Sequence, residues 1–425
     1  MSNRPIKTVL INHSDIHGGA SVVTYRLMYA LRNEGVDASM LVMTRYTDDP
    51  NVHLISSRLR RGLSFVMERM GIMRHNGFSR DSLFKVSTAS TGAGITGHPL
   101  VKNADVIILS WINQGLLSLK DIERLRKMGK KIIWIMHDMW CFTGICHHSY
   151  DCRNYTLRCG NCRFLGLDRA PNDLSNRTWE RKRKFFKDSG IIFVAVSKWL
   201  KERASESLLL KGQRIEVIPN AFPVETFKTS VDTNVKPFSM EKNKRYILMG
   251  AARLDDPIKG IQYAIEALNL IFDENPAIAN SCEVIFFGEI RNPDTLDNLR
   301  FPHRHVGVIR DGNILRNMYA SASVVISSSL FETLPGTLIE GQASGCIPVT
   351  FGRGGQRDII DHMKNGYIAE YKNSKSLAEG IIWALSRPVD REELHNHVET
   401  KFSSKIIARR YMRLLYELTG IGMND

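Results

Sequence analysis

Short apolar runs rich in β-branched residues recur along the whole chain, and segments with helical spacing separate them. Many of these runs end in a glycine-rich or polar turn, which is typical of strands that alternate with helices in a parallel sheet. The pattern predicts strands at 8–11, 38–43, 106–109, 131–136 and 191–196, and again at 246–249, 283–287, 324–327 and 347–350. The two groups predict an α/β fold with two Rossmann-like, doubly wound domains.

An irregular stretch with three prolines separates the two groups of strands. Such a stretch is typical of a boundary between domains. We therefore expect an N-terminal domain over 1–220, an interdomain linker over 221–245 and a C-terminal domain over 246–402. A last helical pattern covers 403–418, and the pattern itself does not indicate which domain this helix packs on.

The length of 425 residues with 43% hydrophobic content suits two cores rather than one. No apolar run reaches the roughly 18 to 20 residues that a membrane span needs, and the start of the chain leads directly into a strand without a signal-peptide pattern. We therefore expect a soluble, cytoplasmic protein. Its seven cysteines would lie in a reducing compartment, where clustered thiols more often bind metal than form disulfides.

Two glutamates in the second half mark a candidate ligand site. Glu332 follows a predicted strand, and Glu340 lies eight residues later, inside a helix that Pro335 and Gly336 are suited to begin. One acid is then placed to hold hydroxyl groups near the helix start, where the free N–H groups of Gly336, Thr337 and Leu338 attract an anion. The pair taken alone is more typical of one solvated and one capping glutamate than of a ligand site.

Two cations follow the first strand of the second group. Arg253 and Lys259 lie in the loop after 246–249, where they are suited to a diphosphate, although such side chains are usually only solvated. The segments near Arg253, Gly288 and Glu332 each follow a predicted strand. In open α/β sheets these ends meet at one edge, where ligands bind. The sequence therefore predicts an anion site at this edge.

In their order and spacing, these motifs resemble the family 4 glycosyltransferases. The resemblance rests on Arg253 and Lys259, on FFGE at 286–289, on the two glutamates, and on Gly354 with Gly355. It extends to GGA at 18–20, HDMW at 137–140 and VIPN at 217–220, so it covers nearly the whole chain. It implies the GT-B architecture of two facing domains, with a nucleotide-sugar held by the C-terminal domain and the acceptor by the N-terminal one. It also implies that the helix at 403–418 packs back on the N-terminal domain.

The resemblance also implies roles for single residues. Arg253 and Lys259 would neutralise the donor diphosphate as it leaves, as electrophilic catalysts. Glu332 would lie near the hydroxyls of the transferred sugar, and Glu340 would hold the ribose. Gly18 and Gly19 would form a turn that approaches the phosphates without a Cβ. His137 resembles the family's active-site histidine; the alternative is a capping or core histidine.

The implied reaction is retaining hexosyl transfer from a nucleotide-sugar, most often a UDP-hexose and less often a GDP-sugar, to a glycan or polyprenyl-diphosphate-linked acceptor in cell-surface polysaccharide synthesis. No residue is an evident nucleophile, so front-side attack assisted by the leaving phosphate is favoured over double displacement. Because two cations supply positive charge, no metal cofactor is required for catalysis.

A nucleotide-sugar epimerase of the same fold is the alternative. Thr333, Leu334, Gly341 and Asp358 depart from the common family pattern, which leaves the donor open.

A cluster of four cysteines lies in the first half. Cys146, Cys152, Cys159 and Cys162 end in the CGNC pair, whose spacing suits a tetrahedral ion, so we expect a structural zinc. This segment also resembles a subset of family 4 enzymes linked to exopolysaccharide, capsule and O-antigen assembly. Metal-free thiols, or His147 or His148 in place of one ligand, are the alternatives. The other three cysteines are expected to be small core residues: Cys141, Cys282 and Cys346.

All of the excess positive charge lies in the first half. Residues 1–220 hold 34 Lys and Arg against 19 Asp and Glu, a net charge of +15, whereas the remaining 24 and 25 give −1. Segments 57–75 and 177–189 mix basic with large apolar residues, and each alone is typical of a surface helix with an apolar inner stripe. Together they favour a peripheral enzyme at an anionic membrane surface, at the inner face of the cytoplasmic membrane. No nucleic-acid recognition motif accompanies them, so nucleic acid is not an expected partner.

Overall fold

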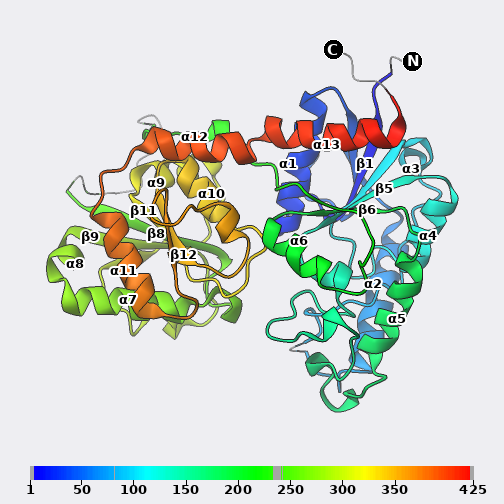
Figure 1. The fold of residues 1–425 in the computed structure, drawn as a ribbon, viewed down its shortest axis with the longest axis horizontal. Coiled ribbons are helices and arrows are strands. Elements are labelled where there is room, and N and C mark those ends of the chain that lie inside the picture. The colour runs from blue at the N-terminus through cyan, green and yellow to red at the C-terminus, as the bar shows by residue number, and fades with distance from the viewer. Residues whose placement is uncertain (1–3, 81, 233–240, 242, 422–425) are drawn as a thin grey trace. The chain divides into compact units, whose positions relative to one another are not determined.

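The computed structural model describes residues 4–80, 82–232, 241 and 243–421 (Figure 1). The chain forms two compact units. The first comprises Met1–Ala221 with Ile407–Asp425, and the second comprises Phe222–Ile406. Each unit has its own sheet and its own hydrophobic core, so each is described separately.

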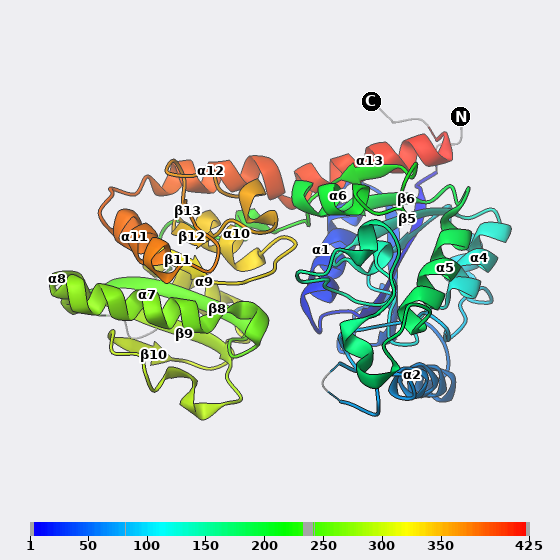
Figure 2. The same ribbon diagram turned by 60° about the horizontal axis from the view of Figure 1, so that its bottom comes forward.

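The first unit is built on a seven-stranded parallel sheet with the strand order β3-β2-β1-β4-β5-β6-β7. Helices cover both faces, with α1 and α5 on opposite sides in both views (Figures 1 and 2). The strands are β1 (Lys7–Ser14), β2 (Asp37–Thr44), β3 (Val52–Leu54), β4 (Val106–Leu109), β5 (Lys131–Met136), β6 (Ile192–Ala195) and β7 (Ile215–Val217). The helices are α1 (Gly19–Asn33), α2 (Arg58–Met73), α3 (Pro99–Asn103), α4 (Leu119–Lys127), α5 (Leu174–Phe186) and α6 (Lys198–Ser205).

The second unit is built on a six-stranded parallel sheet with the order β10-β9-β8-β11-β12-β13. The strands are β8 (Arg245–Arg253), β9 (Cys282–Glu289), β10 (His303–His305), β11 (Val324–Ser327), β12 (Ile347–Phe351) and β13 (Tyr367–Ala369). The helices are α7 (Ile261–Glu274), α8 (Pro276–Ser281), α9 (Gly312–Ser321), α10 (Gly336–Ala343), α11 (Ser374–Leu385) and α12 (Arg391–Phe402). Side chains of α7, α11 and the central strands form its core.

The predicted fold class of two Rossmann-like, doubly wound domains is confirmed. All nine predicted strands are present within a few residues of the expected bounds. They form because a central parallel strand is buried on both faces and therefore has an uninterrupted apolar sequence, as in β4, where all four residues are buried. The sequence pattern does not predict β3, β7, β10 and β13, which are the edge strands of the two sheets and are three residues long each.

The predicted linker at 221–245 differs from the structure. Residues from Phe222 onward belong to the second unit, where Phe222, Val224 and Phe227 are buried, and the N–H of Phe222 donates to the carbonyl of Phe402. Residues 233–240 and 242 of that prediction lie outside the described residues. The last helix, α13 (Ser404–Thr419), enters the first unit at Ile407, where Arg410 donates to the carbonyl of Val217.

Candidate functional site

The predicted anion site lies at the carboxyl edge of the second sheet. The strand order reverses between β8 and β11, and loops from these two strands carry Arg253, Lys259 and Glu332. This switch point is where open α/β sheets leave a crevice outside the strand ends. The fold therefore brings together side chains that are up to 79 positions apart in the chain.

Arg253 at the end of β8 is held by a carboxylate. Its Nε donates to Oδ1 of Asp255 at 3.0 Å, and Oδ2 of Asp255 accepts the N–H groups of Arg291 and Asn292 at 3.1 and 3.0 Å. Burial acts to raise the pKa of Asp255, but these donors outweigh it and hold the pKa below its ordinary value. The carboxylate thus ties the loop after β8 to the loop after β9 and orients the guanidinium.

Lys259 and Glu332 form a partly buried ion pair. The Nζ of Lys259 donates to Oε1 of Glu332 at 2.5 Å. Two further bonds hold the loops that carry them, because Ser328 Oγ donates to the carbonyl of Lys259 at 3.0 Å and the N–H of Leu330 donates to that of Ile258 at 2.8 Å. The ammonium group is therefore positioned before any ligand arrives. A bound diphosphate would compete with the carboxylate for it.

The start of α10 supplies free N–H groups beside this pair. The helix begins at Gly336 with Pro335 at its N-cap, as predicted, and Pro335 provides no side-chain acceptor. The N–H groups at Gly336, Thr337 and Leu338 are therefore the unsatisfied donors of a helix N-terminus, where the helix dipole favours an anion. The side chain of Leu338 is buried, so only its main chain is suited to a ligand. Glu340 is partly buried in the second turn.

Two glycines fix the backbone around this helix. Gly354 has a φ of +139°, and a Cβ there would lie 2.2 Å from the carbonyl oxygen of Glu332, with which it forms an isolated bridge. Gly341 replaces the alanine that is frequent in the resembled family, and a Cβ there would lie 2.6 Å from Cγ1 of Val325. The close approach of α10 to β11 therefore requires a residue without a side chain at position 341.

The predicted site residues of the first unit lie at the carboxyl edge of their own sheet. His137 follows β5, and its Nε2 is 2.8 Å from Oγ of Ser110, which follows β4. Burial lowers the pKa of His137 to about 4, so the imidazole is neutral at pH 7. Gly18 is the N-cap of α1 with a φ of +94°, and neither Gly18 nor Gly19 has an atom within 4 Å of where a Cβ would lie.

Sequence reasoning missed a polar cluster beside His137. Oδ2 of Asp138 lies 2.6 Å from Nδ1 of His147 and accepts the indole N–H of Trp111 at 2.9 Å. Burial alone would raise the pKa of Asp138, but His147 and the hydrogen bonds lower it to about 2. His147, one of the alternative ligands to a thiol, has both ring nitrogens in contact with other side chains, Asp138 and Ser87. The only sequence signal was the adjacent His137 and Asp138 at a strand end.

The four clustered cysteines are free thiols that influence one another electrostatically. Burial raises the pKa of Cys159 to about 12 and that of Cys162 to about 11, and it raises the pKa of Cys146. The N–H of Gly144 donates to Sγ of Cys159 at 3.1 Å, which is a bond that stabilises a thiolate. Within the described residues, however, no three His, Cys, Asp or Glu side chains are arranged to hold a metal ion. The remaining cysteines are buried, as expected: Cys141, Cys282 and Cys346.

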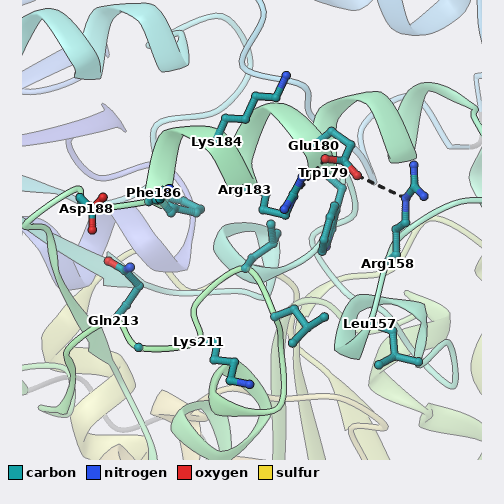
Figure 3. A pocket seen from close by; sticks show the side chains of 14 residues that line it. Leu157, Arg158, Trp179, Glu180, Arg183, Lys184, Phe186, Asp188, Lys211 and Gln213 are labelled. Carbon is teal, nitrogen blue, oxygen red and sulfur yellow. Dashed lines mark hydrogen bonds and ion pairs between the residues drawn. The ribbon is translucent and has the colours of Figure 1, made fainter.

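A pocket of about 970 Å³ lies in the first unit, away from the predicted site residues (Figure 3). It lies between α5 and the segment 208–213, and Arg183, Lys187 and Lys211 contribute to its lining. On α5 itself, Trp179 and Phe186 are buried, so the interpretation of 177–189 as a surface helix with an apolar inner side is confirmed. None of the described helices has the length and apolar content needed to span a membrane.

Comparison with known proteins finds similarity to glycosyltransferases. Residues 232–401 match the family model described as "Glycosyl transferases group 1". An uncharacterized glycosyltransferase of Methanocaldococcus jannaschii is 28% identical over 216 residues, which are 48% of this chain and 54% of that protein. The poly(ribitol-phosphate) alpha-N-acetylglucosaminyltransferase of Staphylococcus aureus is 24% identical over 255 residues, which are 54% of this chain and 48% of that protein. The chain thus spans about half the length of the curated relatives it matches.

Similarity to solved structures covers both units of the chain. HepE of Anabaena, solved in complex with UDP and glucose, is similar over 96% of this chain and 99% of that chain, with a TM-score of 0.62 and 13% identity. At this identity the likeness concerns the fold alone, and it agrees with the expected fold class of two Rossmann-like domains. Residues 232–401, which include Arg253, Lys259, Glu332 and Glu340, are thus similar to the group 1 glycosyl transferases.

Proposed function

We propose that this protein is a retaining glycosyltransferase that moves a hexose from a nucleotide-sugar to an acceptor. The observation that carries the proposal is that Arg253, Lys259 and the uncapped start of α10 lie at the same edge of the second sheet. Two cations and a helix N-terminus at one sheet edge suit a diphosphate. The match of 232–401 to glycosyl transferases supports a diphosphate that belongs to a nucleotide-sugar.

The site residues of the second unit have different roles toward the donor. Arg253 and Lys259 neutralise the charge that develops on the leaving diphosphate, which lowers the barrier to breaking the anomeric bond. Glu332, released from Lys259 when phosphate binds, accepts hydrogen bonds from sugar hydroxyls, and Glu340 holds the ribose. Front-side attack assisted by the leaving phosphate then needs neither a protein nucleophile nor a catalytic metal.

The first unit meets the acceptor. Neutral His137 is able to accept or donate a hydrogen bond at the reacting sugar, and the turn at Gly18 and Gly19 leaves room for phosphate groups. UDP-hexose is the proposed donor, because HepE was solved with UDP and glucose. A glycan or polyprenyl-diphosphate-linked acceptor in cell-surface polysaccharide synthesis suits the +15 charge of residues 1–220, and the S. aureus relative is named for a phosphate polymer. Such an enzyme works in the cytoplasm, at the inner face of the membrane.

A thermal-shift screen of the full chain against UDP-, GDP-, dTDP- and ADP-sugars tests the proposal. One nucleotide class should raise the melting temperature, because a ligand that binds only the folded state stabilises it. Arg253→Ala and Glu340→Ala should lose this rise. Arg300→Ala is the matched control, since Arg300 also pairs with an aspartate of the second unit, Asp273, but lies before β10, at the opposite end of the strands.

The reaction products separate transfer from the alternative. Incubation with the stabilising donor should release free nucleotide, slowly to water and faster when the correct acceptor is added. An isomerised donor without nucleotide release would instead identify an epimerase. If none of the four nucleotide classes stabilises the folded wild-type protein, the donor site is assigned wrongly.

A further inference from the structure

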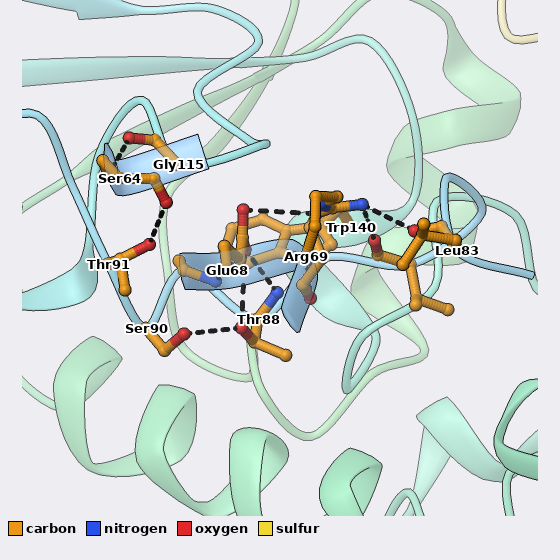
Figure 4. A network of polar contacts seen from close by, with 12 residues as sticks. Ser64, Glu68, Arg69, Leu83, Thr88, Ser90, Thr91, Gly115 and Trp140 are labelled. Carbon is orange, nitrogen blue, oxygen red and sulfur yellow. Dashed lines mark hydrogen bonds and ion pairs between the residues drawn. The ribbon is translucent and has the colours of Figure 1, made fainter. Parts of the chain in front are cut away.

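Helix α2 has a polar side toward the protein. Oγ of Ser64 donates to the carbonyl of Gly115 at 2.6 Å, and Oε1 of Glu68 accepts the N–H groups of Thr88 and Ala89 at 2.9 Å each (Figure 4). Nη1 of Arg69 donates to the carbonyl of Leu83 at 2.5 Å. Figure 4 shows Ser64, Glu68 and Arg69 joined by hydrogen bonds to Gly115, Thr88 and Leu83. The inner face of α2 is therefore fastened by hydrogen bonds.

These contacts fix the rotation of the helix about its axis. Glu68 and Arg69 are buried and pair with each other at 3.2 Å, and Ile72 is the one buried apolar side chain of α2. Separating a buried charged group from its partners costs about 3–5 kcal/mol. Turning the helix to bury a different face is therefore strongly unfavourable, and the outward face stays outward.

The outward face of α2 is apolar. Leu59, Leu63, Val66, Met67 and Met70 are between 48% and 83% exposed. Their spacing places them in one stripe along the helix, about 16 Å from first to last at 1.5 Å per residue. The apolar inner stripe that 57–75 indicates when it is taken alone is thus wrong, because the sequence shows that one side is apolar but not which side faces the protein. Exposed apolar stripes of this size mark surfaces that a partner covers.

The charged side chains around the stripe indicate the chemistry of the partner. Arg58, Arg60, Arg74 and Arg80 are exposed, and the single carboxylate between 51 and 80 is the buried Glu68. From another segment, Asp168 contacts His75 just beyond the end of the helix. A partner must therefore be both apolar and anionic. A second copy of this chain would bring arginines against arginines in a symmetric contact, which is repulsive. An anionic lipid bilayer offers acyl chains to the stripe and headgroups to the arginines.

We propose that α2 is a membrane-docking helix that lies parallel to the surface of an anionic bilayer, with its outward stripe in the headgroup and acyl boundary. This inference deepens the proposed function, because it gives a transferase of lipid-linked acceptors a fixed place at the membrane. The proposed transferase function gives the docking its biological role but is not needed for the docking itself. The docking itself is a property of α2 and is measured without donor or acceptor.

Flotation of the full chain with vesicles tests the proposal. The wild-type protein should float with phosphatidylcholine vesicles that contain about 30% phosphatidylglycerol, at least tenfold more than with phosphatidylcholine alone, and salt should weaken the binding. Leu63→Gln combined with Met67→Gln should reduce flotation at least tenfold while the melting temperature is unchanged, because both side chains are exposed. Leu157→Gln is the matched control, a leucine of the same unit that is 69% exposed outside α2. It should float like the wild type.

Three outcomes would overturn the docking proposal. The first is equal binding to neutral and anionic vesicles, and the second is binding that the α2 variant leaves intact. The third is a dimer, measured by light scattering, that the same variant dissociates, because the stripe would then be a protein interface. Nucleotide stabilisation is measured in parallel. A protein that binds nucleotide but not vesicles contradicts the docking alone, and the reverse result contradicts the transferase alone.

Discussion

At the scale of single residues, packing constrains Gly341 of α10 as strongly as chemistry constrains the charged residues of the candidate site. Gly341 appears in the sequence as a departure from a family pattern, and the structure supplies a reason, since α10 approaches Val325 too closely for a methyl group. Arg253 and Lys259, by contrast, are recognisable from the sequence, but their partners Asp255 and Glu332 are fixed by loop geometry.

Gly341→Ala should destabilise the protein despite the better helix propensity of alanine. Overpacking costs about 1–3 kcal/mol, and the gain of about 1 kcal/mol in helix propensity offsets part of it, so we expect a net loss of about 1 kcal/mol. Urea unfolding of Gly341→Ala, Val325→Ala and the double variant measures this loss. The double variant should be more stable than the sum of the two single effects, and strict additivity would contradict the packing argument.

Asp138→Asn should remove a pH-dependent stabilisation. The folded pKa of about 2 lies below the ordinary 3.8, so the ionised carboxylate stabilises the fold at any pH above about 4, and this stabilisation is lost as the pH falls through about 2. The shift corresponds to about 2 kcal/mol at pH 7. Unfolding of wild type and variant should differ by this amount at pH 7 and converge toward pH 2. The exposed Asp37→Asn is the control, and a difference independent of pH would contradict the assignment.

At the scale of elements, the segments that follow the strands supply polar and thiol side chains whose positions helix or strand geometry does not determine. The segment from His137 to Cys162 contains just two short 3-10 helices, yet it supplies Asp138, His147 and the clustered thiols. Its shape depends on contacts with segments far away in the chain, such as the bridge of Cys146 with Val86. The segment from His137 to Cys162 therefore has no periodic sequence pattern from which its structure could be predicted.

We still propose a structural zinc at Cys146, Cys152, Cys159 and Cys162, which requires the thiols to turn toward one another. Metal analysis of protein purified with reductant and zinc should find about one zinc per chain, and chelation should lower the melting temperature, because metal binding contributes to folding free energy. Cys159→Ser with Cys162→Ser should lose the metal, whereas Cys346→Ser in the second unit should retain it. Protein without stoichiometric zinc would leave four unligated thiols, which is the alternative interpretation.

At the scale of the whole molecule, the predictions succeeded where burial is complete and failed at the margins. The strands β1, β2, β4, β5 and β6 and their counterparts in the second unit are long apolar runs because both faces are covered. The four edge strands are too short and too exposed to differ from loops in composition. Residues 222–232 have the irregular pattern of a linker, interrupted by Pro223, yet three apolar side chains anchor them to the second unit.

The sequence by itself determined the number of sheets, their central strands, the start of α10 at Gly336 and the positions of the charged residues, because burial on both faces and helix capping leave local patterns. The tertiary structure alone decided the pairing of Lys259 with Glu332 and of Asp138 with His147, and the direction in which α2 faces. These depend on partners that are distant in the chain. The amphipathic pattern of α2 is the same whether its apolar side faces inward or outward, and the polar groups between Leu83 and Gly115 settle which side is buried.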